Sequence, residues 1–289
     1  MRRWLGCIRV DGDLPSRRMP VLNDEKETNL AAVAPGAGFA VSPKLQVKEV
    51  FALAHAIKYA GRPIRQPARS DEAKVPVLIV PGIVVGDWFM TPLRRHLRRA
   101  GHVTIDSQIV SNIRCSDAAL ERLERILEAE VAKHGRPIAI VGYSRGGMFG
   151  RALATRRPDL VAGLITLASP LIDAATAVSP VLLGPVGLMA RLNRTGSSQL
   201  MSDDCLNGEC YERTALELAQ KFPRDIPFTS VISSEDGFVE RRAMLDPDAQ
   251  HVEVREGHLS IVASKETFRV IDASLAEMHA TKRARRVAS

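Results

Sequence analysis

The chain has 289 residues, of which 45% are hydrophobic, and it carries a formal net charge of +7. This length suits one globular core with appendages, and no apolar stretch approaches the length of a bilayer-spanning helix. Aromatic residues make up only 4% of the chain, too few to interleave stacking rings with the basic charge as nucleic-acid binding requires. Composition therefore argues against a membrane-spanning protein and a nucleic-acid partner, and leaves peripheral contact with an anionic membrane surface as a minority interpretation.

The N-terminus begins with basic residues, but Asp11 and Asp13 appear before the apolar core of a signal peptide develops. We therefore expect a cytoplasmic location. The four cysteines are too few for a disulfide scaffold and lack the paired spacing of a zinc site, so neither a metal nor a cofactor is predicted. Cys205 and Cys210 flank an Asn-Gly pair, and both a loop-stapling disulfide and two free thiols remain open for them.

Residues 1–41 lack sustained periodicity and include an Ala/Gly/Pro-rich run, which predicts a flexible N-terminal arm. The main domain is expected to span residues 42–280, followed by a basic C-terminal tail over residues 281–289. Within this domain, capping and stop signals predict a first helix that begins at Ser42 and ends at Gly61.

Predicted strands and helices then alternate along the chain. Apolar runs predict a strand over residues 138–141 and buried strands over residues 75–80 and 161–168. Further strands are predicted over residues 103–110, 228–232 and 251–254. Helical spacing of apolar residues and capping signals predict helices over residues 91–101 and 116–134, from 147 onward, over 213–221, and around Phe268 to Met278. This alternation predicts an α/β fold with a mainly parallel central sheet and helices on both faces. Ligands of such sheets bind beyond the carboxyl ends of the strands.

The most informative motif is Gly142-Tyr143-Ser144-Arg145-Gly146, which lies between a predicted strand and a predicted helix. A serine on such a sharp turn takes strained backbone angles that hold its hydroxyl exposed. The flanking glycines lack a Cβ and let the strand and the helix approach closely. Ser144 is therefore the predicted nucleophile.

A nucleophilic serine needs a histidine to take its proton and an acid to orient that histidine. Among the histidines after Ser144, His258 directly follows a predicted strand and is the preferred base, whereas His251 within that strand is the alternative. The acid is expected after the preceding strand, where Asp236 is preferred because an Asp-Gly pair supports a turn. Glu235 remains the second choice.

Two backbone N–H groups are candidates for binding an oxyanion. One belongs to Arg145, directly after the nucleophile at the head of a helix. The other belongs to Ile83, in the loop after the first predicted strand, where Gly82 allows close approach of the backbone. A simple strand-ending turn is the alternative interpretation of this loop.

The stretch 170–210 is apolar and interrupted by Pro and Gly. Its place between the strand after the elbow and the predicted acid suits a lid or cap over an acyl-binding pocket. Apolarity fits ordinary core helices equally well, so both interpretations stay open.

Taken together, these motifs resemble the α/β-hydrolase superfamily, in particular its bacterial lipases and carboxylesterases. The resemblance covers the chain from Ser42 to Met278 and rests on four ordered motifs, Val80 to Ile83, Gly142 to Gly147, Ser233 to Val239 and Glu256 to Leu259. Many lipases have His-Gly where this chain has Pro81-Gly82, and the place of Ile83 is often aromatic in them. Both departures concern the identity of the substrate more than the mechanism.

The resemblance implies an α/β-hydrolase fold with a catalytic triad of Ser144, Asp236 and His258 and a two-amide oxyanion hole. It also implies cleavage of a carboxylic ester through an acyl-enzyme. If the apolar insert is a lid, the substrate is a hydrophobic ester or a lipid. The alternatives are an acyltransferase that uses the same residues and a non-catalytic member that keeps the pocket as a binding site.

Overall fold

The computed structural model describes residues 7–9, 44–45, 49, 74–193 and 200–288. Most of the predicted arm and of the helix expected from Ser42 to Gly61 lies outside these residues. Within the arm, Cys7–Arg9 form strand β1, which differs from the expected lack of regular structure. A run of three residues is too short for an alternating hydrophobic pattern to reveal a strand. Strand β1 is recognised through its backbone pairing with residues 251–253, far along the chain.

Seven parallel strands form the central sheet of the described residues, in the order β1-β7-β6-β5-β4-β2-β3. The remaining strands are β2 (Val77–Val80), β3 (Thr104–Asp106), β4 (Ile138–Tyr143), β5 (Val161–Leu167), β6 (Phe228–Ser233) and β7 (Gln250–Val254). Strands β2, β4 and β6 are buried along their whole length, as expected for parallel strands that helices cover on both faces. The apolar runs of β2 and β4 indicate these strands in the sequence.

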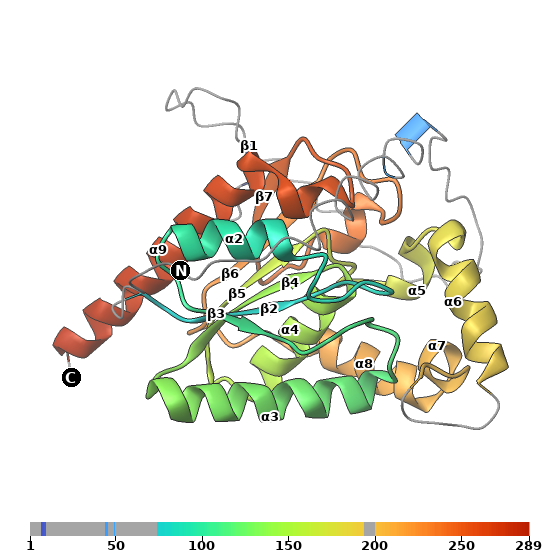
Figure 1. Ribbon diagram of the computed structural model, residues 1–289, viewed down its shortest axis with the longest axis horizontal. Coiled ribbons are helices and arrows are strands. Elements are labelled where there is room, and N and C mark those ends of the chain that lie inside the picture. Colours follow the sequence, from blue (N-terminus) through green and yellow to red (C-terminus); the bar gives the residue numbers. More distant parts are fainter. Residues whose placement is uncertain (1–6, 10–43, 46–48, 50–73, 194–199, 289) are drawn as a thin grey trace.

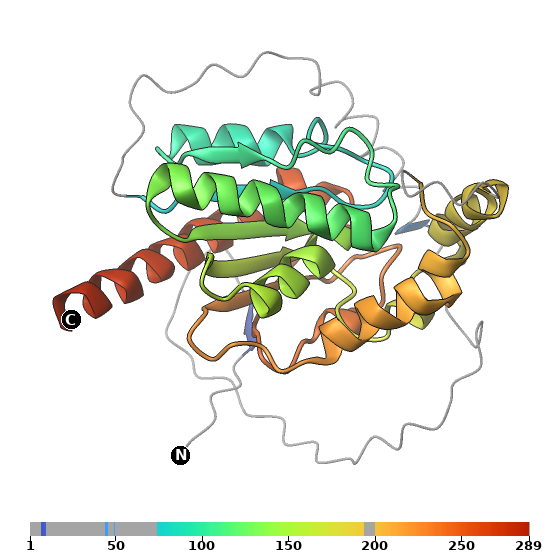
Figure 2. The same ribbon diagram turned by 90° about the horizontal axis from the view of Figure 1, so that it is seen from below.

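Helices cover both faces of this sheet (Figure 1). Helices α2 (Thr91–Arg99) and α9 (Lys265–Ala288) lie on one face, and α3 (Ser116–His134) and α4 (Arg145–Arg156) lie on the other. Figure 2 views the molecule from the side of α3. Successive residues of β2 alternate between two core clusters, one beneath each helical layer. The predicted α/β architecture is therefore confirmed.

Several elements differ from their predicted bounds, among them β3, α4 and α9. Strand β3 ends at Asp106 instead of continuing to Val110, because β3 is an edge strand and Gln108 takes a left-handed φ of 58° that breaks the extended chain. Helix α4 begins at Arg145, directly after the predicted nucleophile. Helix α9 continues to Ala288 through most of the residues expected to form a tail.

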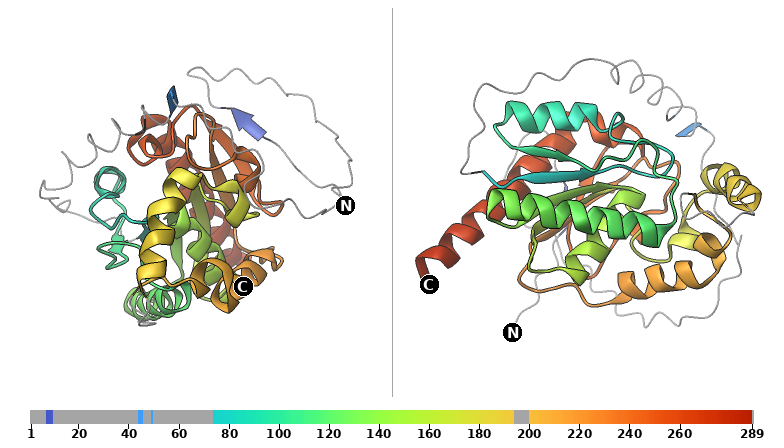
Figure 3. Two further views of the ribbon diagram at one scale, coloured as in Figure 1. Left: turned by 90° about the vertical axis from the view of Figure 1, so that its right-hand side faces the viewer. Right: turned by 60° about the horizontal axis from the view of Figure 1, so that its bottom comes forward.

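The predicted insert forms helices beyond the carboxyl ends of the central strands (Figure 3). It contains α5 (Ala174–Ala177), α6 (Pro180–Leu192) and α7 (Asp204–Asn207), and α8 (Glu209–Ala219) begins within it. Ser179 caps α6, because its hydroxyl accepts the Val181 N–H, and Pro180 occupies the first turn. We refer to residues 170–193 and 200–219 as the cap.

Two single-turn 3-10 helices, η1 (Arg241–Met244) and η2 (Ser260–Ala263), complete the described elements. Among the helices in the described part of the chain, none is both long and apolar enough to cross a membrane.

Candidate active site

Ser144 lies on the tight turn between β4 and α4. Its φ of 52° and ψ of −122° are rare for a residue with a side chain and mark a strained backbone. The close approach of strand and helix requires the two flanking glycines. A Cβ on Gly142 would lie 2.5 Å from the carbonyl oxygen of Gly146, and one on Gly146 would lie 2.3 Å from that of Val80. The fold therefore presents the Ser144 hydroxyl at the carboxyl end of a central strand.

The structure brings Ser144, His258 and Asp236 into one hydrogen-bonded chain. Ser144 Oγ lies 3.1 Å from His258 Nε2, and His258 Nδ1 lies 2.8 Å from Asp236 Oδ2. Ser144, His258 and Asp236 follow strands β4, β7 and β6, respectively, and in the sheet β7 pairs with β6 while β5 separates β6 from β4. His258 and Ser144 are 2% and 4% exposed. The hydrogen-bonded chain is therefore shielded from bulk water, and a proton can pass between positioned groups within it.

Asp236 is aimed at His258 by its own turn. Its Oδ1 accepts the N–H groups of Phe238 and Val239 at 2.8 and 2.7 Å, which leaves Oδ2 for the imidazole. The structure thus brings Asp236, rather than its neighbour Glu235, to the histidine. The other candidate base, His251, instead hydrogen-bonds to the backbone carbonyl of Asp246 at 2.8 Å.

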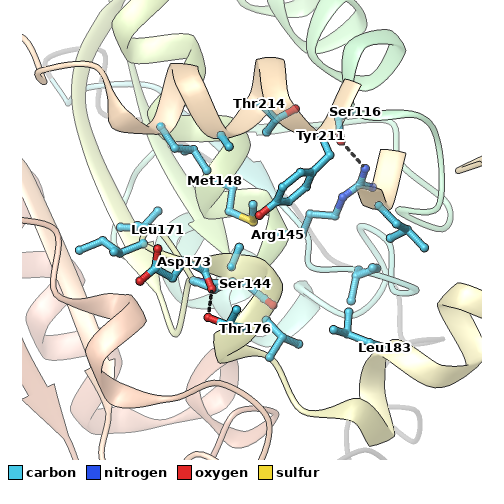
Figure 4. Close-up of a pocket in the computed structure, with 18 of the residues that line it drawn as sticks. Ser116, Ser144, Arg145, Met148, Leu171, Asp173, Thr176, Leu183, Tyr211 and Thr214 are labelled. Atoms are coloured by element: carbon cyan, nitrogen blue, oxygen red, sulfur yellow. Dashed lines mark hydrogen bonds between the residues drawn. The ribbon is translucent and has the colours of Figure 1, made fainter. Parts of the chain in front are cut away.

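Ser144 lies at one wall of a large cavity (Figure 4). The cavity has a volume of about 1170 Å³, slightly above the usual range for small-molecule sites. Its lining includes Ile83 and Arg145 at the Ser144 end and the cap residues Leu183, Leu188 and Tyr211. In Figure 4 the Tyr211 side chain extends from α8 between Met148 and Arg145.

A model of the alpha/beta hydrolase fold family matches residues 91–204. This chain has an α/β-hydrolase fold. The mature form of the lipase BlEst2 from Bacillus licheniformis is 18% identical, with a TM-score of 0.50, over 74% of this chain and 96% of that protein. A monoacylglycerol lipase from Paleococcus ferrophilus is 14% identical, with a TM-score of 0.50, over 72% of this chain and 96% of its own.

A structure reported for LipS and LipT, two metagenome-derived lipolytic enzymes, is 15% identical with a TM-score of 0.50, over 75% of this chain and 98% of that one. At these identities the likeness concerns the fold. The structural neighbours of this α/β-hydrolase fold thus include lipases and other lipolytic enzymes.

In this hydrolase fold the imidazole of His258 is enclosed between the rings of Tyr143 and Phe238, whose centroids lie 5.2 and 5.8 Å from it. Burial by itself lowers the pKa of the imidazole. The charge and the hydrogen bond of Asp236, together with the charge of Glu49, outweigh burial, and the pKa of His258 is raised above its ordinary value of 6.5. Asp236 and Glu49 therefore stabilise the protonated form of His258.

Glu49 is a positioning residue that sequence reasoning missed. Its carboxylate accepts the backbone N–H of His258 and, at 2.7 Å, that of Leu259, and it is 2% exposed. Burial, the largest influence, raises the pKa of Glu49. A Cβ on Gly257 would lie 2.5 Å from a Glu49 carboxylate oxygen, so glycine is required beside the base. No local pattern marks Glu49, because its partner lies 209 residues away.

Asn112, also missed, connects the two candidate oxyanion donors. Its Nδ2 donates to the carbonyl of Pro81 at 2.8 Å, beside Ile83, and its Oδ1 accepts from the Arg145 guanidinium at 2.9 Å. Asn112 is 1% exposed. The sequence does contain a signal for Asn112, because this residue follows strand β3. Polar residues that come after parallel strands tend to reach the ligand-binding edge of the sheet.

The structure also brings together three cysteines that are distant in the sequence. Cys205 and Cys210 are free thiols that form no disulfide with each other, and both lie beside the thiol of Cys115. Among the described residues, the groups of His, Cys, Asp or Glu side chains close enough to hold a metal ion comprise this cysteine trio alone. Its Cys115 member precedes α3 and was not considered with the other two in the sequence.

Proposed function

We propose that this protein is a serine hydrolase of carboxylic esters with a hydrophobic acyl or alcohol group. The observation that carries the proposal is the hydrogen-bonded chain from Ser144 through His258 to Asp236 at the wall of a large cavity. A serine, a histidine and a buried carboxylate in this order of contact match the requirements of nucleophilic acyl transfer. The lipase and lipolytic-enzyme neighbours add support for an ester substrate.

In the first half of the proposed reaction, Ser144 Oγ attacks the ester carbonyl carbon while His258 Nε2 takes the hydroxyl proton. The carbonyl oxygen becomes an oxyanion, which the backbone N–H groups of Ile83 and Arg145 bind. When the tetrahedral intermediate collapses, the carbon–oxygen bond to the alcohol breaks, and His258 gives its proton to the departing alkoxide. Asp236 stabilises the imidazolium throughout without becoming protonated.

In the second half, His258 takes a proton from water as the water oxygen attacks the acyl-enzyme. Collapse of the second intermediate releases the carboxylic acid, and Ser144 regains its proton from His258. These steps need neither a metal ion nor a cofactor. The partly apolar cavity wall of Met148, Leu171 and Leu183 favours an acyl chain over a charged substrate because apolar surface is removed from water on both partners.

The test is labelling of folded protein with a fluorophosphonate probe, followed by peptide mapping. We expect one labelled residue, Ser144, and no labelling after heat denaturation or in Ser144→Ala. Ser234→Ala, which removes an exposed hydroxyl of the acid loop, should label like the unaltered protein. Absence of labelling in folded protein would contradict every enzymatic interpretation and favour a non-catalytic binding protein.

If Ser144 is labelled, p-nitrophenyl esters of increasing acyl length test the substrate class. We expect kcat/KM to rise with chain length beyond acetate. Activity confined to acetate would refute the hydrophobic pocket and leave the mechanism standing. Product analysis with an added alcohol separates hydrolysis from acyl transfer, because a transferase yields the new ester in preference to the free acid.

A further inference from the structure

The three clustered cysteines come from separate elements and meet at the junction between the cap and the sheet. Cys115 directly precedes α3, Cys205 lies in α7, and Cys210 lies in α8. Cys205 and Cys210 are 5% and 1% exposed, and Cys115 is half-buried. The trio belongs to none of the steps of the proposed ester chemistry, so its presence needs a separate explanation.

The spacing of the sulfur atoms fits ligands of a single ion. All three Sγ atoms lie within 4.8 Å of one another, and those of Cys115 and Cys210 are 3.5 Å apart. Tetrahedral zinc binds thiolate sulfur at about 2.3 Å, which places neighbouring sulfurs roughly 3.8 Å apart. The 3.5 Å separation is close to this value and no sulfur pair is more than 4.8 Å apart, so small rotations of side chains are enough to reach it.

The charge of Arg145 indicates what kind of ion the site suits. The Arg145 side chain is buried, and its guanidinium donates to the oxygen atoms of Asn112, Arg114 and Ser116, all of which are neutral. Among the described residues, no carboxylate forms an ion pair with it. Burial lowers the pKa of Arg145 to about 10, and the charges of the three cysteines are the influences that oppose burial. A buried cation of this kind favours a neighbouring anion.

Three thiolates by themselves would repel one another and carry too much negative charge. Zn²⁺ bound to three thiolates leaves a net charge of −1, which matches the single positive charge of Arg145. Copper(I) in the same place would leave −2, a poorer match. Thiolate ligands also exclude the hard cations Mg²⁺ and Ca²⁺, which prefer oxygen.

We propose that Cys115, Cys205 and Cys210 form a three-thiolate zinc site, with Arg145 as its counter-charge. The three thiols take no part in the proposed ester cleavage, although Cys205 and Arg145 line the same cavity as Ser144. Bound zinc fastens α7 and α8 of the cap to the loop that holds the Arg145 side chain. The metal therefore has a structural role, in fixing the cap relative to the wall of the cavity.

The experiment uses the full chain, purified anaerobically under reducing conditions without a chelator. Elemental analysis should find one equivalent of zinc per chain. After removal of zinc, a titration with Co²⁺ should give sulfur-to-cobalt charge-transfer absorption and the visible bands of tetrahedral cobalt, saturating at one equivalent. Readdition of Zn²⁺ should remove both signals and raise the Tm.

Matched cysteine variants assign the ligands. Cys205→Ser should weaken Zn²⁺ binding, measured by competition with a chromophoric chelator, by more than about 100-fold, because loss of a ligand exceeds the effect of losing a supporting hydrogen bond. Cys7→Ser, which removes the remaining cysteine on edge strand β1, should leave the stoichiometry and the affinity unchanged. The cobalt spectrum of the unaltered protein decides the question even where a variant fails to fold.

Three results would overturn the proposal. The first is an unaltered chain that binds no metal while all of its thiols react with Ellman's reagent. The second is a Cys115–Cys210 disulfide that persists under the reducing conditions. The third is equal loss of zinc in Cys7→Ser. Failure of ester cleavage with intact zinc binding would contradict only the proposed function, because the metal readouts do not depend on activity.

Discussion

The wall of the cavity around Ser144 and the cap differ in the contacts that hold them in place and in the exposure of their apolar side chains. The wall rests on the ends of fully buried strands, and hydrogen bonds on two sides fix the side chains of Asp236 and His258. Part of the cap packs in a small separate cluster, with Val186, Met201, Cys205 and Cys210 as the buried members. Its α6 exposes Val181, Leu188 and Leu192 by 59%, 61% and 74%.

This difference implies that the wall and the cap have different roles. A rigid wall preserves the geometry that proton transfer needs, whereas an apolar helix with exposed side chains can adapt to the part of the substrate that does not react. Changes in the wall should therefore alter turnover of every ester alike, and changes in the cap should alter discrimination between esters. Four substitutions test this division, from the largest expected effect to the smallest.

Ser144→Ala should lower kcat roughly a million-fold for short and long esters alike, because no other group on the wall replaces the attacking oxygen. The change removes one oxygen and keeps the strained φ of 52°, so the Tm should move little. Steady-state kinetics on two esters and a thermal melt check both parts. Substantial remaining turnover would show that another residue is the nucleophile.

Asp236→Asn should lower kcat about 10⁴-fold. Because neutral His258 is the base, kcat/KM should rise with pH, with a midpoint above the ordinary 6.5 in the unaltered protein. Removing Asp236 eliminates the charge and the hydrogen bond that raise the pKa of His258, so burial prevails and the midpoint moves to lower pH. A pH profile of kcat/KM provides the measurement.

Glu235→Gln is the matched control for this prediction. It neutralises the adjacent carboxylate in the same loop and should leave the midpoint and kcat close to those of the unaltered protein. A larger loss in Glu235→Gln than in Asp236→Asn would reverse the assignment of the acid.

Glu49→Gln should lower kcat about 10-fold to 100-fold. The His258 and Leu259 N–H groups donate to different carboxylate oxygens, and the substitution replaces one of these oxygens with an NH₂ group that cannot accept. A hydrogen bond to a charged group is worth about 1.5–3 kcal/mol. The lost charge also lowers the pKa of His258, which shifts the rising limb of the pH profile downward. Glu256→Gln, which alters a carboxylate bonded to the Ser260 hydroxyl instead, is the control, and an unmoved pH limb in Glu49→Gln would argue for a purely structural role.

Leu188→Asp should lower kcat/KM for long-chain esters by about 10-fold and leave acetate unaffected, since burying an aliphatic side chain is worth about 1.5–3 kcal/mol. Leu188 lies on α6 and lines the cavity. Leu216→Asp on α8, equally exposed at 68% but outside the cavity lining, is the control. An equal loss on acetate and on long esters would contradict the proposed division between wall and cap.

The sheet and the order of its elements could be predicted because each carries a local signal. Buried parallel strands are continuous apolar runs, and α3 runs from Ser116 to His134 as its leucine spacing and following glycine indicate. Ser144, Asp236 and His258 were each selected by their place after a strand, and the fold brings those three positions together. The bounds of β3 could not be predicted, because the left-handed Gln108 has no counterpart in hydrophobicity.

The site residues that could not be predicted depend on contacts between residues far apart in the sequence. Glu49 and Cys115 become informative only when His258 and Cys210 are beside them, and no periodicity encodes such a meeting. Asn112 is an intermediate case, since its position after a strand was visible while its two partners were not.

Glu49 also bears on where the smallest active unit of this protein begins. A chain shortened to start at Lys74 would retain strands β2 to β7 together with Ser144, Asp236 and His258, and by inspection of the sheet alone would look complete. It would nevertheless lose the carboxylate that fixes the backbone of the base. The residues ahead of β2 are thus not all dispensable, and truncation series intended for expression or crystallisation should stop short of position 49.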